Sequence, residues 1–306
     1  MSATEVFIFS YNRGQLLQNC VQSAQKYIPN VSITVIDDNS DDPETIKVLN
    51  NFDSEVRVLK PNLDDGSRWG GFYNNINWVI QELAESRWVL LIEDDMQYVR
   101  PFLKEDYSRI NSFFNNNPRS AYLAVEFLKE RLREKDQQSL IVDKEQDMYF
   151  FKESAEDYRG TIHICSSGVL NIQLMREVGY KFVGDRPEIR ARAKKQFTRK
   201  GFYPYPLLMY LPSAPSVKNR KSTFTRNLIE YYYKTGFYPY KEMSHRELQQ
   251  FMNRDISILP YTSDFIETMD KSIKPPYIYA DSMRRCHGLF RRIEKVEKKL
   301  RGLASQ

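Results

Sequence analysis

Residues 4–40 have the sequence TEVFIFSYNRGQLLQNCVQSAQKYIPNVSITVIDDNS, which predicts a strand, a helix and a second strand. A short apolar run at 6–9 stops at a polar turn, and apolar residues then recur at helical spacing as far as Ala24. A second apolar run at 31–36 ends abruptly in Asp37 and Asp38. Strands that alternate with helices through short connections favour a parallel sheet with helices packed on it.

The same alternation continues to about residue 100. Three polar clusters, at 10–13, 37–42 and 93–95, directly follow predicted strands. Because ligands of open α/β sheets bind just beyond the carboxyl ends of the strands, we expect these clusters to meet in one site. The further elements expected in this half are a helix at 43–51, a strand at 56–59, a polar loop at 62–71, a helix at 72–85 and a strand at 88–92.

The second half is less regular. A charged stretch at 129–157 lacks a clear pattern, and several prolines after residue 203 interrupt the periodicity, which indicates a boundary. The fold class expected is α/β, a mostly parallel central sheet flanked by helices, with a helical, Tyr-rich C-terminal extension. The elements expected are helices at 102–116, 172–178, 190–199 and 244–253, and strands at 121–125 and 161–170.

Composition limits the class of protein. With 306 residues, 41% hydrophobic and 13% aromatic, the chain can bury a substantial core, so disorder is excluded. Three widely separated cysteines, Cys20, Cys165 and Cys286, exclude a disulfide framework and a Cys-rich zinc site, and favour a reducing compartment. The sequence contains neither an apolar run of bilayer length nor an N-terminal signal pattern, so we expect a cytoplasmic protein.

The net charge of +5 is concentrated at the C-terminus. Residues 281–306 hold eight basic and three acidic side chains, so the first 280 residues are neutral, which argues against a nucleic-acid partner. This tail predicts an amphipathic basic helix interrupted at Gly288. It could attach to the inner face of an anionic membrane, mediate self-association, or pack on its own domain with a solvated basic face. Its apolar stripe consists of Met283, Cys286, Leu289, Phe290, Ile293, Val296, Leu300 and Leu303.

The cluster of Glu93, Asp94 and Asp95 predicts a metal site. Adjacent carboxylates repel one another unless a cation or hydrogen-bond donors compensate them. Mg²⁺ and Mn²⁺ prefer oxygen ligands and commonly bind through one or two carboxylates together with substrate phosphates. A solvated acidic turn is the alternative, but the position after a buried strand favours the metal. Asp37 or Asp38, at another strand end, could accept hydrogen bonds from a ribose or a base.

Four segments, at 6–13, 35–40, 62–75 and 91–95, resemble in order and spacing the GT-A fold nucleotide-sugar glycosyltransferases, especially family 2. Residues 166–202 are similar to the acceptor-side segment of that family. The resemblance covers about residues 4–210. It implies a glycosyltransferase domain at 1–212, with a nucleotide-binding half at 1–100 and an acceptor half at 101–212, followed by an extension at 213–306.

The resemblance also implies a reaction. A sugar would move from a nucleotide diphosphate sugar to a hydroxyl of a glycan or lipid-linked acceptor, with inversion and with Mn²⁺ or Mg²⁺. Asp95 would be the main metal ligand, with Asp94 on the ribose or the metal and Glu93 beside them. The residues implied to bind the nucleotide are Ser10, Tyr11, Arg13, Asp37, Asp38, Arg68 and Asp94.

The catalytic base is less well defined. Inverting family members use a carboxylate to deprotonate the acceptor, usually within a Glu-Asp pair about a dozen residues before a helix-ending glycine. This chain has Asp185-Arg186-Pro187-Glu188 instead, so Asp185 and Glu188 are equal candidates. Glu188 could equally be an acidic residue favoured at a helix N-terminus. The missing pair also leaves open a catalytically inactive module that binds a nucleotide or a glycan.

Overall fold

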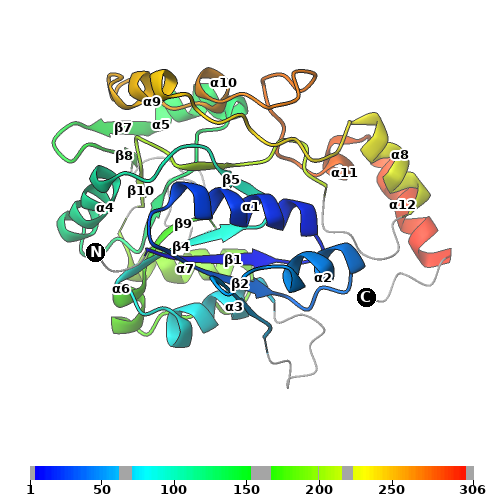
Figure 1. Cartoon of the computed structure of the whole chain (residues 1–306), viewed down its shortest axis with the longest axis horizontal. Coiled ribbons are helices and arrows are strands. Elements are labelled where there is room, and N and C mark those ends of the chain that lie inside the picture. The colour runs from blue at the N-terminus through cyan, green and yellow to red at the C-terminus, as the bar shows by residue number, and fades with distance from the viewer. Residues whose placement is uncertain (1–3, 62–70, 153–166, 199, 216–222, 301–306) are drawn as a thin grey trace.

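The computed structural model describes residues 4–61, 71–152, 167–198, 200–215 and 223–300. Its centre is a nine-stranded sheet in the order β3-β2-β1-β4-β9-β6-β10-β8-β7 (Figure 1). The first four strands of that order are parallel and arise from the alternation expected of the sequence. Their bounds are β1 Thr4–Ser10, β2 Val31–Asp37, β3 Val56–Leu59 and β4 Trp88–Glu93.

The other half of the sheet is mixed. Strand β9 lies antiparallel between β4 and β6, and β6 pairs parallel with β10. Strand β8 is antiparallel to both β10 and β7, so seven of the nine strands point the same way. This confirms the predicted α/β class with a mostly parallel sheet. The bounds are β6 Tyr122–Ala124, β7 Leu140–Asp143, β8 Met148–Phe151, β9 Gly168–Asn171 and β10 Gly201–Phe202.

Helices cover both faces of the sheet because successive side chains of each strand point to opposite faces. In β1, Val6 and Ile8 belong to one buried cluster and Phe7 and Phe9 to another. Helices α1 and α4 contribute to the first cluster, and α3, α6 and α7 to the second; Figure 1 shows α1 and α3 on opposite sides. The bounds are α1 Gly14–Tyr27, α2 Pro43–Asn50, α3 Phe72–Trp78, α4 Lys104–Asn116, α6 Ile172–Glu177 and α7 Arg186–Gln196.

A second, two-stranded sheet lies next to the acidic cluster. Strand β5, Met96–Tyr98, pairs antiparallel with β11, Leu208–Tyr210, so that Tyr210 lies opposite Met96. The amide of Leu211 donates to the carbonyl of Asp95 at 2.7 Å. This pairing brings residues more than a hundred positions apart to the end of β4.

Two segments differ in detail from the expectation. The helix expected at 72–85 is α3 followed by a π-helical turn at Val79–Leu83, where Arg176 of α6 donates to the carbonyls of Ile80 and Ala84 at 2.5 and 2.7 Å. Long-range donors thus replace part of the regular helix ladder. The stretch at 129–157 that lacked a pattern contains a 3₁₀ turn at Glu130–Leu132, helix α5 at Arg133–Ser139 and the β7–β8 hairpin. Of the strand expected at 161–170, residues 167–170 lie within the described residues, and β9 begins there at Gly168.

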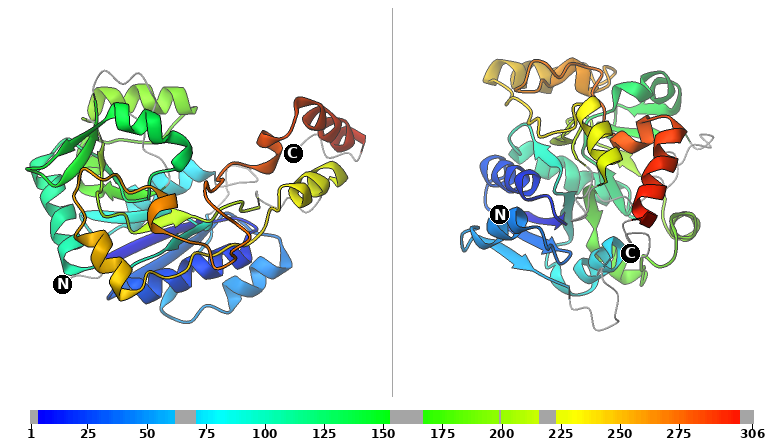
Figure 2. Two further views of the ribbon diagram at one scale, coloured as in Figure 1. Left: turned by 90° about the horizontal axis from the view of Figure 1, so that it is seen from above. Right: turned by 90° about the vertical axis from the view of Figure 1, so that its right-hand side faces the viewer.

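The residues after 212 are partly integrated into the main core. Tyr240, Phe251, Ile266 and Tyr277 belong to the same buried cluster as α1. Helices α8, α11 and α12 are different, because they project from the body (Figure 2). A small buried cluster of their own joins α8 to α11. The domain division at residue 212 stays a prediction. The bounds are α8 Phe224–Tyr232, α9 His245–Met252, α10 Thr262–Phe265, α11 Ser282–Arg285 and α12 Gly288–Leu300.

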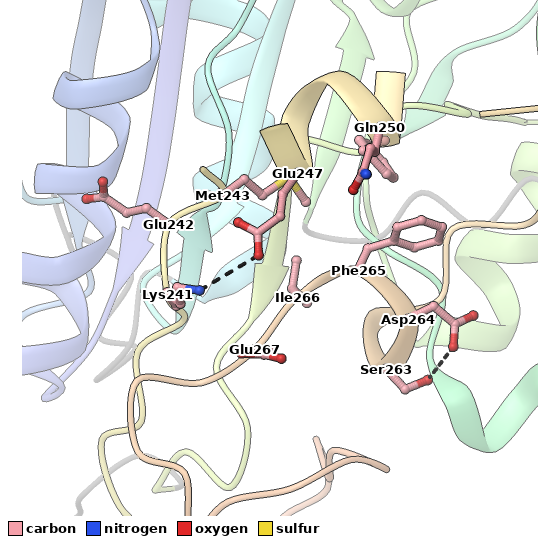
Figure 3. A pocket seen from close by; sticks show the side chains of 11 residues that line it. Lys241, Glu242, Met243, Glu247, Gln250, Ser263, Asp264, Phe265, Ile266 and Glu267 are labelled. Carbon is pink, nitrogen blue, oxygen red and sulfur yellow. Dashed lines mark hydrogen bonds and ion pairs between the residues drawn. The ribbon is translucent and has the colours of Figure 1, made fainter. Parts of the chain in front are cut away.

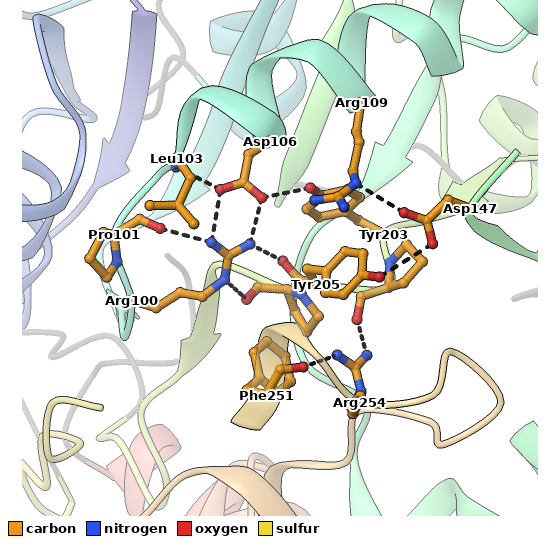
Figure 4. Close-up of polar contacts among 12 residues, drawn as sticks. Arg100, Pro101, Leu103, Asp106, Arg109, Asp147, Tyr203, Tyr205, Phe251 and Arg254 are labelled. Carbon is orange, nitrogen blue, oxygen red and sulfur yellow. Dashed lines mark hydrogen bonds and ion pairs between the residues drawn. The ribbon is translucent and has the colours of Figure 1, made fainter. Parts of the chain in front are cut away.

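A buried ion pair joins the segment after β5 to α4, and its guanidinium also donates to the carbonyl of Pro206, just before β11. Both side chains of the pair, Arg100 and Asp106, are fully inaccessible to solvent. Figure 4 shows the guanidinium directed at the carboxylate, with the hydroxyl of Tyr203 on the other side of Asp106. Strand β11 contains Tyr210, whose hydroxyl lies next to Glu93, so this network helps to position a residue beside the acidic cluster.

Candidate functional site

Asp94 is the buried centre of the site. It follows β4, and its amide donates to the carbonyl of Phe9 at 3.1 Å, so the parallel pairing with β1 continues to this residue. One carboxylate oxygen accepts from Ser10 Oγ at 3.0 Å and from the Tyr11 amide at 3.3 Å. Burial raises the pKa of Asp94 to about 7, and the neighbouring Arg13 guanidinium opposes that shift. The structure therefore brings Ser10, Tyr11, Arg13 and Asp94 together, as the strand-end argument predicts.

Arg13 bridges the two aspartates. It lies at the start of α1, forms an ion pair with Asp94, and donates from Nη1 to Asp95 Oδ2 at 2.9 Å. Burial alone would lower the pKa of Arg13, but Asp94, Asp95 and Glu93 together raise it above its ordinary value. Its positive charge is thus balanced by carboxylates of the protein. The guanidinium of Arg13 is thus bound to Asp94 and Asp95.

Asp95 differs from Asp94 in its exposure to solvent. Its side chain keeps 17% of its accessible surface, whereas that of Asp94 keeps none. While Oδ2 accepts from Arg13, Oδ1 is buried and has no hydrogen-bond partner among the described residues. Buried polar atoms normally have a partner, so an orphaned carboxylate oxygen fits a divalent cation that also takes phosphate and water ligands.

Glu93 has a different hydrogen-bond partner from its two neighbours. Its Oε1 lies 3.4 Å from the Tyr210 hydroxyl, which is also 2.7 Å from Ser167 Oγ. Within the described parts of the chain, no group of three acidic, histidine or cysteine side chains could hold a metal. Consecutive residues at a strand end direct their side chains differently. Metal binding by Glu93 and Asp94 together with Asp95 stays a prediction. Asp94 Oδ1 and Asp95 Oδ1 both lack a hydrogen-bond partner among the described residues, but Asp94 Oδ1 is ion-paired with Arg13.

Two charged residues of the site escaped the sequence analysis. Glu126 follows β6, which runs in the same direction as β4, and its Oε2 is buried without a hydrogen-bond partner in the described structure. Burial is the main cause that lowers the pKa of Lys129, against the opposing charges of Glu126, Asp95 and Glu93. The sequence did hold a signal for Glu126, because this acid directly follows the apolar strand predicted at 121–125, as Glu93 follows the strand predicted at 88–92.

Tyr210 connects these groups. Burial raises the pKa of its hydroxyl well above the ordinary value, and Glu93, Glu126 and Asp95 add to that effect. The Nζ atom of Lys129 lies 4.5 Å from the centre of the Tyr210 ring and 5.4 Å from that of Tyr279. The site thus combines a cation, a neutral phenol and several carboxylates at one end of the sheet.

The two acids at the end of β2, Asp37 and Asp38, have different partners. Asp37 is fully buried and accepts from the Ser40 amide at 3.1 Å, so its carboxylate shapes the turn. Lys60 lies 3.6 Å from the same carboxylate. The amide of Asp38 donates to the Ser10 carbonyl at 2.9 Å, and its side chain accepts from Asn75 of α3 at 3.2 Å. Asp38 is therefore adjacent to β1, while Asp37 is occupied within its own turn.

Arg68 and Ser166, which the sequence assigned to the nucleotide and acceptor segments, lie outside the described residues.

Asp185 and Glu188 form a reciprocal capping box. The Glu188 amide donates to Asp185 Oδ1, and the Asp185 amide to Glu188 Oε2, both at 3.0 Å. Both residues are exposed at the start of α7, which begins four residues before the predicted position because of this cap. Their carboxylates are thus used in helix capping, the alternative that the sequence left open for Glu188. A catalytic role for either stays a prediction.

A separate pocket of about 250 Å³ lies between α9 and α10. Figure 3 shows acidic side chains around it, and two of them have local partners. Glu247 caps α9 and lies 3.7 Å from Lys241, and Asp264 pairs with Arg133 at 2.7 Å. Because these carboxylates serve the surrounding helices, the pocket is distinct from the strand-end site.

Comparison with known proteins gives a family match. The family model described as Glycosyl transferase family 2 matches residues 5–173, which include β1, β2, β4 and the acids that follow them. No curated protein sequence matches this chain.

Solved structures of low identity have a similar arrangement. The Staphylococcus aureus TarS fragment 1–349 is 14% identical, covers 68% of this chain and has a TM-score of 0.48. GalNAc-T7, solved with UDP, GalNAc and Mn²⁺, is 13% identical over 68% of this chain, with a TM-score of 0.45. The mannosyltransferase PcManGT from Pyrobaculum calidifontis, solved with GDP-Man and Mn²⁺, is 10% identical over 76% of this chain, with a TM-score of 0.42. The match spans 60%, 43% and 63% of those chains, respectively.

Proposed function

Because the chain belongs to glycosyl transferase family 2, we propose that it transfers a sugar from a nucleotide diphosphate sugar to an acceptor hydroxyl. The observation that carries this proposal is the cluster of Ser10, Arg13, Asp94 and Asp95, where the carboxyl ends of β1 and β4 meet. It lies within the matched residues and where open α/β sheets bind their ligands. The acceptor expected is a glycan or a lipid-linked saccharide.

The donor site follows from the neighbours of this cluster. Asp38 lies beside β1 and is the acid placed to accept hydrogen bonds from the nucleoside. Asp95 would hold Mn²⁺ or Mg²⁺ through its orphaned Oδ1. When bound, such an ion neutralises the charge that develops on the departing diphosphate. Arg13 keeps Asp95 in place through Oδ2 and so leaves the other oxygen available.

Transfer with inversion requires a base for the acceptor proton. As the acceptor oxygen bonds to the anomeric carbon, the bond from that carbon to the diphosphate breaks and the hydroxyl proton moves to a carboxylate. The sequence offers Asp185 and Glu188, which cap each other at the surface. The structure adds Glu126, whose Oε2 is buried and unpartnered in the described residues. The three candidates are compared by measuring turnover and donor binding in Asp185→Asn, Glu188→Gln and Glu126→Gln. The variant that loses turnover but still binds the donor identifies the base.

The donor test is a thermal-shift screen of UDP, GDP, CDP and dTDP, each with Mn²⁺, Mg²⁺ or EDTA. A ligand that binds only the folded state at a hundred times its Kd stabilises it by about 2.7 kcal/mol. We expect one nucleotide to give a metal-dependent shift, which Asp95→Asn removes. Glu44→Gln, an exposed acid in the first turn of α2, is the matched control and keeps the shift.

Absence of a shift with every nucleotide would overturn the donor site. A shift without transfer or donor hydrolysis would instead identify the inactive binding module that the missing Glu-Asp pair left open.

A further inference from the structure

Helix α12 exposes the side that an amphipathic helix normally buries. Leu289, Ile293, Val296 and Leu300 lie on one stripe and are 55%, 44%, 56% and 83% exposed. Glu294, on another side of the helix, is only 6% exposed. A packed helix usually turns its apolar stripe to the core and its charges to water. These four apolar side chains of α12 are therefore not buried within the described part of the chain.

Polar contacts with α8 set this orientation. Glu294 accepts from Arg226 Nε at 2.9 Å, and the same guanidinium lies 3.5 Å from Asp281. Glu297 accepts from the amides of Phe224 and Thr225 at 2.6 and 3.0 Å, which satisfies donors at the start of α8. The acidic side of α12 is thus held against α8, and the apolar stripe, about a quarter turn from it at 100° per residue, stays exposed.

Helix α8 adds a second apolar surface. Phe224, Leu228, Tyr231 and Tyr232 are 68%, 49%, 84% and 75% exposed, whereas Ile229 is buried against α11 residues. Helices α8 and α12 lie side by side in both views of Figure 2, away from the central sheet. We use the name α8–α12 face for these two exposed apolar stripes, one on each of two adjacent helices.

Positive charge borders this face. At about 100° per residue, Arg292, Lys295 and Lys299 fall along one flank of the α12 stripe, and all three are exposed. The nearby acids are Glu294 and Glu297, and both are engaged with α8. The outward surface of α12 therefore presents apolar groups and cations, with its acids turned inward.

We propose that the α8–α12 face binds an anionic lipid surface. The aliphatic and phenylalanine side chains would enter the boundary between headgroups and acyl chains, where tyrosines are also favoured. The flanking cations would contact lipid phosphates and carboxylates. The binding is peripheral: within the described residues, no helix combines the length and apolarity needed to cross a bilayer.

Charge complementarity favours an anionic lipid surface, rather than a second copy of the chain, as the partner of the α8–α12 face. A symmetric dimer formed through this face would bring the cationic flanks of two copies close together and repel them. An anionic bilayer instead complements both the apolar stripe and its flank. The proposal is independent of the transfer reaction, although such binding would bring the site near lipid-linked acceptors.

The test uses the full chain and sedimentation with vesicles of phosphatidylcholine, with and without 30 mol% phosphatidylserine. We expect binding to the anionic vesicles that falls as salt rises, and little binding to the neutral ones. Each cation near such a surface contributes about fivefold in affinity, so Arg292→Gln, Lys295→Gln and Lys299→Gln together should weaken binding about 100-fold. Val296→Gln with Leu300→Gln should also weaken binding, at unchanged circular dichroism.

A matched control removes three exposed cations elsewhere, by Lys194→Gln, Lys195→Gln and Lys271→Gln, and should bind as the wild type does. Equal loss in the control would show a non-specific charge effect and overturn the proposal. It would also be overturned if anionic vesicles failed to bind the wild type. Analytical ultracentrifugation covers the remaining outcome: a dimer that Val296→Gln with Leu300→Gln dissociates would make the face an interface between copies.

Discussion

Replacing Arg100 by methionine should destabilise the fold strongly. Its two Nη atoms donate to the two carboxylate oxygens of Asp106 at 2.8 Å each, and neither side chain is accessible to solvent. The same guanidinium donates to the carbonyls of Pro206 and Pro101 at 2.9 and 2.8 Å and to that of Tyr205 (Figure 4). Methionine has a similar length but supplies no hydrogen-bond donor.

The magnitude follows from what remains after the substitution. Asp106 would stay buried with two donors, the Tyr203 hydroxyl at 2.6 Å and the Leu103 amide at 2.7 Å, but without a countercharge. Loss of one partner from a buried ion pair costs about 3–5 kcal/mol. We therefore expect Arg100→Met to lower the free energy of unfolding by about 4 kcal/mol.

Urea unfolding followed by circular dichroism measures this difference. The matched control is Lys26→Met, which breaks the Lys26–Glu242 pair at the surface, where the side chains are 53% and 56% exposed. It should change the free energy of unfolding by less than about 1 kcal/mol. Replacing both buried partners, with Arg100→Met and Asp106→Leu, should recover part of the loss, since no uncompensated charge remains. A loss below about 1 kcal/mol for Arg100→Met alone would refute the reasoning.

Three further predictions concern the described core. Gly201→Ala would place a Cβ atom 2.3 Å from a ring carbon of Phe113, so overpacking should lower the free energy of unfolding by about 1–3 kcal/mol in urea titrations. Asn12→Ala should lower the free energy of unfolding by about 2 kcal/mol, because two backbone amides after β2 lose their acceptor. Alanine also tolerates the positive φ of 51° at this position less well than asparagine does. Asn12→Gly, which tolerates that φ, should lose less. Burial raises the pKa of the Cys20 thiol well above its ordinary value, so mass spectrometry after native treatment with iodoacetamide at pH 8 should find that peptide unmodified, and modified only after unfolding.

The sequence by itself determined the frame of the site. Apolar runs at 6–9 and 88–92 specify buried strands, and a polar residue directly after such a strand emerges at the sheet edge. For that reason the sequence predicts that the polar clusters at 10–13 and 93–95 lie at one edge, where the structure pairs Ser10 with Asp94. The family resemblance rested on the same segments, and the family match confirms it.

Only the tertiary structure decided how the charges pair. Asp94 and Asp95 are adjacent in sequence, yet one is buried by Ser10 and Arg13 and the other keeps an orphaned oxygen. Glu126 enters the site because β9 is inserted antiparallel between β4 and β6, an order that periodicity does not encode.

The C-terminal helix shows the same distinction. Its amphipathic pattern and its break near Gly288 are local properties, and both are present in the structure. Which side of α12 faces solvent depends on Arg226, 68 positions before its partner Glu294. Periodicity fixes which side chains share a face of a helix, whereas the direction of that face depends on contacts with residues distant in the chain.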